Sequence, residues 1–199
     1  MKRLILASAS PARRRLLIAA GIDPEVIVSD VDESIVDIAD PAALAGTLAG
    51  LKARAVAATR PDGKDLVLGC DSVLEFDGLA LGKPGDPAEA IRRWRAMRGR
   101  SGVLHTGHCL IEEASGTSAD AVASTTVHFA DVSDQEIERY VATGEPLHVA
   151  GSFTIDGIGS AFVERIEGNH GTVVGLSMPL LRRLLAQLGV QITELWRAG

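Results

Sequence analysis

The chain has 199 residues, of which 46% are hydrophobic and 23% are charged, and its formal net charge is −6. This length and composition are ordinary for a globular α/β protein with an aliphatic core, built as one large domain or two small lobes. The negative net charge argues against binding to a nucleic-acid backbone, so any anionic ligand must be held by local basic groups.

The sequence indicates a cytoplasmic protein without a membrane partner. No stretch approaches the ~20 apolar residues of a membrane span. The apolar run after Lys2 and Arg3 breaks into serines and arginines, unlike a signal peptide. Cys70 and Cys109 lie in apolar, strand-like runs, so we expect buried, reduced thiols rather than a disulfide framework.

A strand, a polar turn and a basic helix are predicted at the N-terminus. Leu4–Leu6 predicts a buried strand, and Ser10 before Pro11 predicts the start of a helix. Arginines at residues 13–15 follow, although the helix N-terminus carries partial positive charge and disfavours cations. A bound phosphate would compensate for them; the alternative is a solvated basic patch. The predicted phosphate-binding residues are Ser8, Ser10, Arg13 and Arg14.

Further along the chain, strands and helices alternate. Strands are predicted at residues 25–29, 66–70, 73–76, 79–81, 102–112 and 121–129. A strand–turn–strand unit is predicted from the glycines at 151–159 through Val163. Residues 169–171 are predicted to form a turn. Helices are predicted from Asp40-Pro41 to Ala58, from Asp86-Pro87 to Met97, from Ser133 to near Gly144 and from Pro179 to Gly189. This order favours an α/β fold with a mixed sheet.

Polar side chains follow several predicted strands. They are Arg13 and Arg14 after the first strand, Glu33 after the second, Asp71 after the central strand and Lys83 after a hairpin. Because ligands of open α/β sheets collect at strand ends, these side chains are expected to share one cleft. Two carboxylates and several cations suit a divalent metal with a polyphosphate, since Mg²⁺ relieves carboxylate repulsion. Each of these residues also has an alternative, purely structural interpretation, such as a capping aspartate or a solvated lysine. Lys52, for example, lies in a predicted helix where a lysine commonly extends its charged end to solvent.

Short motifs along nearly the whole chain resemble the Maf family. They are S-A-S-P-A-R-R at 8–14, D-E-S at 32–34, L-K-A-R-A at 51–55, G-C-D-S-V at 69–73, G-K-P at 82–84, H-T-G at 105–107, Y-V-A-T-G-E-P-L-H-V-A-G-S-F at 140–153 and V-V-G-L at 173–176. The resemblance implies a single domain over residues 1–199, with an elongated mixed β-sheet flanked by helices and two lobes with a cleft between them. This fold is similar to that of inosine triphosphate pyrophosphatases.

The resemblance also implies an activity. Maf proteins are nucleoside triphosphate pyrophosphatases that cleave an NTP to NMP and pyrophosphate with a divalent metal, Mg²⁺ or Mn²⁺. They are thought to remove non-canonical or surplus nucleotides, and were first linked to septum formation. A homodimer is a further implied partner, because family members are often dimers. The alternatives are a non-catalytic nucleotide-binding regulator of cell division and, less in keeping with the acidic charge, a nucleic-acid-associated factor.

Roles for individual residues follow from the same resemblance. Asp71 matches the family's proton acceptor, and Arg13, Glu33, Lys52 and Lys83 match its other polar active-site positions. Glu33 and Asp71 are the implied metal-side carboxylates, and the cations are implied to hold the triphosphate. The chemistry agrees, since attack at the α-phosphate needs an activated water and positive charge near the leaving group.

Three positions depart from members that prefer dTTP and UTP. Ala12, Ser72 and Asp156 stand where those members have Arg, Thr and Gln. An ionised Asp156 accepts hydrogen bonds only, so it favours a base that presents donors, such as guanine or cytosine. Members acting on 7-methyl-GTP carry an acid near this position but have Trp at position 12. We therefore predict a preference other than dTTP or UTP, with the base left open.

Some conspicuous residues receive no role. Gly157-Ile158-Gly159 is too short for a dinucleotide-binding fingerprint, and Glu145 lies in a family-like motif with no role derivable from sequence. His105 and His108 are predicted on opposite faces of a strand, so a shared metal is not expected.

Overall fold

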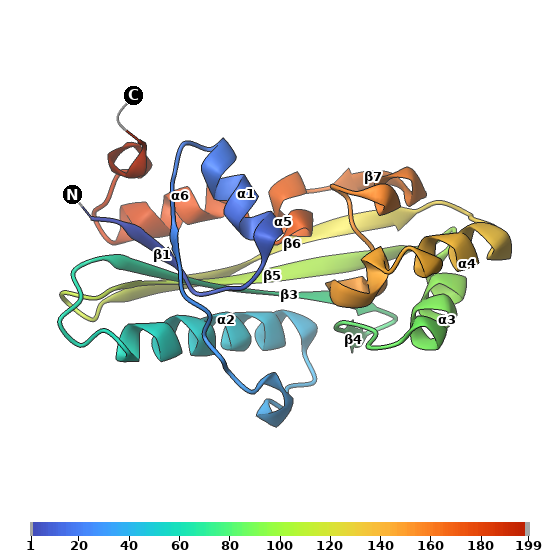
Figure 1. Ribbon diagram of the computed structural model, residues 1–199, viewed down its shortest axis with the longest axis horizontal. Coiled ribbons are helices and arrows are strands. Elements are labelled where there is room, and N and C mark those ends of the chain that lie inside the picture. The colour runs from blue at the N-terminus through green and yellow to red at the C-terminus, as the bar shows by residue number, and fades with distance from the viewer. Residues whose placement is uncertain (1, 198–199) are drawn as a thin grey trace.

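Residues 2–197, which the computed structural model describes, form a seven-stranded mixed sheet flanked by helices (Figure 1). The strand order is β2-β1-β3-β5-β6-β7, and β4 pairs with β3 outside this path. β1 pairs in parallel with β2 and β3, whereas the other pairs are antiparallel. The predicted α/β fold with a mixed sheet is confirmed. Residues 1, 198 and 199 of the predicted domain lie outside the described part.

The elements have the following bounds. The strands are β1 (Leu4–Leu6), β2 (Glu25–Val26), β3 (Leu66–Phe76), β4 (Leu79–Leu81), β5 (Ser101–Glu112), β6 (Ser118–Phe129) and β7 (Val163–Glu167). The α-helices are α1 (Pro11–Ala19), α2 (Pro41–Ala58), α3 (Pro87–Met97), α4 (Asp134–Ala142), α5 (His170–Val174) and α6 (Met178–Gln187). The 3-10 turns are η1 (Glu33–Ile35), η2 (Glu145–His148), η3 (Ala150–Ser152), η4 (Ile158–Phe162) and η5 (Ile192–Leu195).

The helix starts follow the local sequence. The side chains of Ser10, Asp40 and Asp86 each accept a hydrogen bond from a backbone N–H of the first helical turn, and a proline follows each cap. The Ser133–Glu136 capping box at α4 is also present. These contacts form within four residues of chain, which is why the sequence predicts them.

Three predicted elements are wrong. The central strand does not end at residues 71–72 but continues as β3 to Phe76. The segment before Val163 forms η3 and η4 rather than a strand–turn–strand unit, and β7 begins at Val163. Residues 169–171, predicted as a turn, lead into α5.

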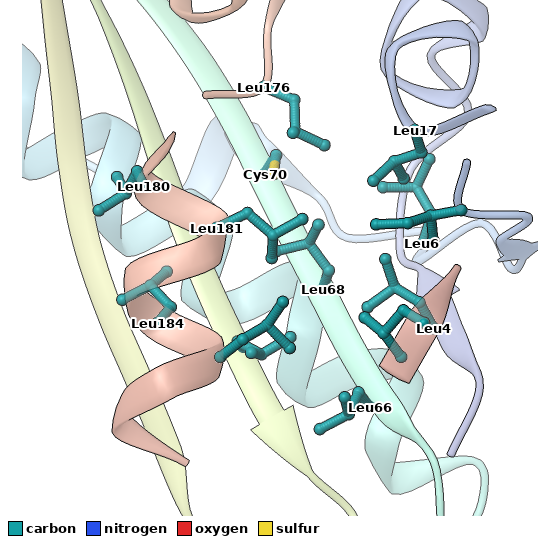
Figure 2. Close-up of a cluster of buried hydrophobic side chains, with 14 of the residues drawn as sticks. Leu4, Leu6, Leu17, Leu66, Leu68, Cys70, Leu176, Leu180, Leu181 and Leu184 are labelled. Atoms are coloured by element: carbon teal, nitrogen blue, oxygen red, sulfur yellow. The ribbon is translucent and has the colours of Figure 1, made fainter. Parts of the chain in front are cut away.

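Two aliphatic and aromatic cores lie on one face of the sheet. Near the chain termini, α1 and α6 pack leucines against β1 and β3; Figure 2 shows Leu6, Leu68 and Leu181 among them. At the other end, α3 and α4 enclose Trp94, whose indole N–H donates to the carbonyl of Ser152 at 2.7 Å. The long strands β5 and β6 run through both regions. Within residues 2–197, no helix is both long and apolar enough to cross a membrane.

Helix α2 covers the opposite face and touches the sheet at two glycines. A Cβ atom on Gly69 would lie 2.2 Å from the carbonyl oxygen of Ala49, and one on Gly107 would lie 2.2 Å from that of Ala45. This close contact requires glycine at both strand positions. The contact also fixes the distance between Lys52 and the sheet, because Lys52 lies one helical turn after Ala49 on the same buried face of α2.

The edge of β3 has a gap. β1 pairs with β3 at residues 66–68, and β4 pairs with it at residues 74–76. Within the described part of the chain, no strand covers residues 69–73 on that side. Successive side chains of a strand point to opposite faces of the sheet. Side chains from both faces of β3 can therefore reach the open space at this gap.

Candidate active site

A cavity of about 830 Å³ lies beside the open stretch of β3. This volume is within the usual range for a small-molecule site. Its lining includes every predicted site residue except Arg14, namely Ser8, Ser10, Ala12, Arg13, Glu33, Lys52, Asp71, Ser72, Lys83 and Asp156. The side chain of Arg14 is exposed outside the cavity. Residues from distant parts of the sequence therefore meet at one place in the fold.

Lys52 joins two carboxylates inside this cavity. Its Nζ atom lies 2.5 Å from Oδ1 of Asp71 and 2.7 Å from Oε1 of Glu33. Lys52 is 9% exposed and Asp71 is 8% exposed. Burial raises the pKa of Glu33, but Lys52, Lys83 and Arg13 outweigh it and hold that pKa below its usual value. The site thus keeps Glu33 ionised beside a buried ammonium group.

Arg13 is held by three contacts within the described residues. Its Nε donates to the carbonyl of Gly175 at 2.8 Å, and its Nη atoms donate to Ser8 at 2.9 Å and to Ser72 at 3.1 Å. Gly175 has a φ of +119°, which favours glycine, and its carbonyl faces the guanidinium. A guanidinium carries five N–H donors, so these contacts leave capacity for an anion. Arg13 is thereby fixed in one orientation at the cavity.

Arg15 meets Asp156 at the rim of the cavity. Nη2 of Arg15 lies 3.1 Å from Oδ2 of Asp156. The sequence interpretation selected Arg14 instead and missed Arg15. A signal was present, because Arg15 lies three positions after Ala12 and such residues share one face of a helix. Ser72, the third predicted specificity position, bonds Arg13 rather than this pair.

Lys83 follows β4 by two residues, as the sequence predicts. The carbonyl of Gly82, directly before it, accepts hydrogen bonds from Nη1 of Arg93 at 2.6 Å and from the N–H of Gly151 at 3.3 Å. Arg93 in turn bonds Glu89 at 2.7 Å. This contact between α3 and the Gly82 carbonyl locates the loop that carries Lys83.

The carboxylates of Glu33 and Asp71 could hold a divalent metal. Both bond to the same ammonium group, so their oxygens already gather around one cation. No group of three or more His, Cys, Asp or Glu residues with metal-binding geometry occurs within residues 2–197. This donor set fits Mg²⁺ or Mn²⁺ that takes further ligands from substrate phosphates and water, as Mg²⁺ commonly does.

The two strand histidines lie on opposite faces, as predicted. His105 contacts Glu75 at 2.9 Å and Ser124 at 2.8 Å on the α2 side. Nε2 of His108 accepts from the N–H of Ser177 at 2.9 Å, at the start of α6. Burial, together with the nearby Arg13, lowers the pKa of His108 to about 4. His108 is therefore a neutral structural link between β5 and α6.

Comparison with known proteins identifies the family. The model of the Maf-like protein family matches residues 3–188. A nucleoside triphosphate pyrophosphatase of Salinispora tropica is 67% identical over 202 residues, covering 99% of this chain and 88% of that protein. One of Streptomyces coelicolor is 59% identical over 195 residues, covering 98% and 95%.

A solved nucleoside-triphosphatase / dITP/XTP pyrophosphatase from Mycobacterium abscessus aligns with a TM-score of 0.42 at 16% identity, over 94% of each chain. The family match spans the gap in β3 and the whole cavity lining. The chain belongs to the Maf-like protein family.

Proposed function

We propose that this chain hydrolyses nucleoside triphosphates to nucleoside monophosphates and pyrophosphate. The observation that carries the proposal is the meeting of Asp71, Glu33, Lys52, Arg13 and Lys83 around one cavity. A triphosphate needs several cations, and an attacking water needs a base. The relatives named above as nucleoside triphosphate pyrophosphatases support the same activity.

The contacts of each residue indicate its role in the proposed reaction. Lys52 occupies Oδ1 of Asp71, which leaves Oδ2 to accept a proton from a water that attacks the α-phosphorus. The bond from that phosphorus to the bridging oxygen breaks, and the electron pair leaves with the pyrophosphate. Arg13, Lys52 and Lys83 stabilise the charge that develops there. When bound by Glu33 and Asp71, a divalent cation neutralises phosphate charge.

The base preference is the finer part of the proposal. Asp156 lines the cavity and bonds Arg15, so the pair offers a base both acceptor oxygens and N–H donors. Ala12 also lines the cavity and contributes no polar side-chain atom. We place the preferred substrates outside the dTTP and UTP class, among non-canonical or surplus nucleotides.

One assay tests both the proposed cleavage reaction and the proposed base preference. The chain is incubated with a panel of canonical and modified nucleotides, with Mg²⁺, Mn²⁺ or a chelator, and the products are separated by anion exchange. We expect monophosphate and pyrophosphate in equal amounts, released only with metal. Release of diphosphate and phosphate contradicts the proposed cleavage site, and dTTP and UTP as the best substrates contradict the base preference.

A further inference from the structure

Glu145 binds both ends of the loop formed by residues 154–159. Within residues 2–197, its carboxylate accepts hydrogen bonds from the hydroxyl of Thr154, from the N–H of Ile158 at 3.0 Å and from the N–H of Gly159 at 2.9 Å. It also accepts from the hydroxyl of Tyr140 at 3.0 Å. One carboxylate therefore fixes where this loop leaves the core and where it returns.

Asp156 lies at the middle of this loop. The N–H of Thr154 donates to the hydroxyl of Tyr140 at 3.2 Å, which adds a second anchor before Asp156. Only residues 155–157 separate that anchor from the next one at Ile158. Because so short a span has few conformations, the anchors set the position at which Asp156 enters the cavity and meets Arg15.

The glycines of the loop are required by this arrangement. A Cβ atom on Gly157 would lie 2.5 Å from Oε2 of Glu145, and one on Gly159 would lie 2.3 Å from the hydroxyl oxygen of Tyr140. Gly157 thus allows the backbone to approach the carboxylate, and Gly159 allows it to approach the Tyr140 hydroxyl. Burial raises the pKa of Glu145, but the hydrogen bonds donated to it outweigh burial and keep that pKa below its usual value. The contacts are therefore made to a charged acceptor, which strengthens them.

We infer that Glu145 is a positioning residue for base selection: its carboxylate fixes the 154–159 loop and so places Asp156 against the nucleotide base. The inference rests on the proposed function for the identity of the ligand. It assigns Glu145 no contact with the triphosphate, whose binding groups lie on α1, α2, β3 and the loop after β4. A substitution of Glu145 should consequently change the relative affinities for different bases and leave the affinity for the triphosphate nearly unchanged.

Glu145→Gln is the main test, because glutamine keeps the size of the side chain but replaces one acceptor oxygen by an NH₂ group. In either orientation that NH₂ group faces a backbone N–H, that of Ile158 or that of Gly159, and this contact is lost. The probes are the α,β-methylene analogues of ATP, GTP, CTP and UTP, with inorganic tripolyphosphate for the phosphate part alone, measured by calorimetry. We expect the affinity ratio between the best and the worst base to fall about tenfold. The affinity for tripolyphosphate stays within about twofold.

Two controls accompany the test. Glu164→Gln changes the same functional group at an exposed position of β7 and should leave every affinity unchanged. Tyr140→Phe keeps the ring that packs on Trp94 but removes one donor to Glu145, so it should reproduce part of the effect even if Glu145→Gln does not fold. Amide hydrogen exchange at Ile158 and Gly159 should accelerate in Glu145→Gln and not in Glu164→Gln.

The outcomes separate this inference from the proposed function. An unchanged base ratio in a folded variant overturns the role of Glu145, and so does a wild-type chain that binds every analogue and tripolyphosphate equally. A wild-type chain that selects among bases but releases no pyrophosphate overturns the proposed function, while the same binding ratios still decide the role of Glu145.

Discussion

Nζ of Lys52 donates to Oδ1 of Asp71 at 2.5 Å, between residues that are 19 positions apart in the chain. Helix α2 presents the lysine and β3 presents the aspartate, and both are buried. Within residues 2–197, Oδ2 of Asp71 has no hydrogen-bond partner. The lysine thus orients the carboxylate and leaves one oxygen for a water molecule.

Replacing Asp71 by Asn tests the proton-acceptor role. The amide keeps the shape of the side chain but cannot take up the proton, so kcat should fall about 10²–10⁴-fold. Pyrophosphate release measures the loss, and circular dichroism checks that the variant folds. Undiminished turnover in a folded Asp71→Asn chain would remove Asp71 from this role.

Replacing Lys83 by Ala tests the proposed role of the loop after β4 in phosphate binding. Loss of one charge-assisted contact to the triphosphate should lower kcat/KM about 10–100-fold. Lys64→Ala is the matched control, because Lys64 is also exposed but lies outside the cavity lining. Equal kcat/KM values for the two variants would exclude Lys83 from the site.

Replacing Gly69 by Ala should separate α2 from β3. The added Cβ would lie 2.2 Å from a backbone carbonyl, so overpacking should cost about 1–3 kcal/mol of unfolding free energy and lower Tm by about 2–12 °C. Turnover should fall as well, because Lys52 moves away from Asp71.

Gly50→Ala, on α2 itself, is the control for Gly69→Ala. Its Cβ would meet the flexible guanidinium of Arg54 rather than backbone, and alanine favours a helix, so Tm should stay equal or rise. A Gly69→Ala chain as stable and active as wild type would show that the glycine contact does not set the Lys52 position.

The buried His108 predicts a loss of stability in acid. Its folded pKa of about 4 lies below its ordinary 6.5, so between these values the unfolded chain binds more protons. The stability gained from neutral His108 is complete above about pH 6.5 and is lost as pH falls towards about 4.

Urea unfolding of wild type and His108→Gln measures this effect, because glutamine can accept from Ser177 but does not titrate. The difference in unfolding free energy between the two chains should shrink by about 2–3 kcal/mol from near pH 7 to about pH 4.5. A difference independent of pH would mean that His108 does not titrate on unfolding in this range.

The parts of the fold that the sequence predicts are those set by nearby residues. Ser10 with Pro11 starts α1, and Asp77 with Gly78, both at positive φ, turns the hairpin between β3 and β4 as expected. The 154–159 loop was missed because its shape depends on Glu145, whose contacts reach 9 to 14 positions along the chain. No local pattern reports such contacts.

The sequence predicts much of the cavity lining, because several polar residues follow apolar runs and because the resemblance to the Maf family adds Lys52. The apolar run at residues 66–70 predicts that Asp71 follows the strand, whereas the structure places it inside β3. A buried carboxylate is unfavourable inside a strand unless it is paired. The structure supplies the pair in Lys52, which comes from another element. No local pattern distinguishes Arg15 from Arg14, because the partner of Arg15, Asp156, lies 141 positions away.

The uncovered stretch of β3 makes the cavity sensitive to the length of that strand. Asp71 and Ser72 are neighbours in the sequence, but their side chains point to opposite faces of the sheet. Asp71 accepts a hydrogen bond from Lys52 on one face, and Ser72 accepts one from Arg13 on the other. Inserting or deleting a single residue before Asp71 would turn both side chains to the opposite faces of the sheet, so Asp71 would no longer face Lys52 and Ser72 would no longer face Arg13. Evolution of this enzyme family can therefore exchange the chemistry of either residue by substitution, but hardly by insertions or deletions within β3.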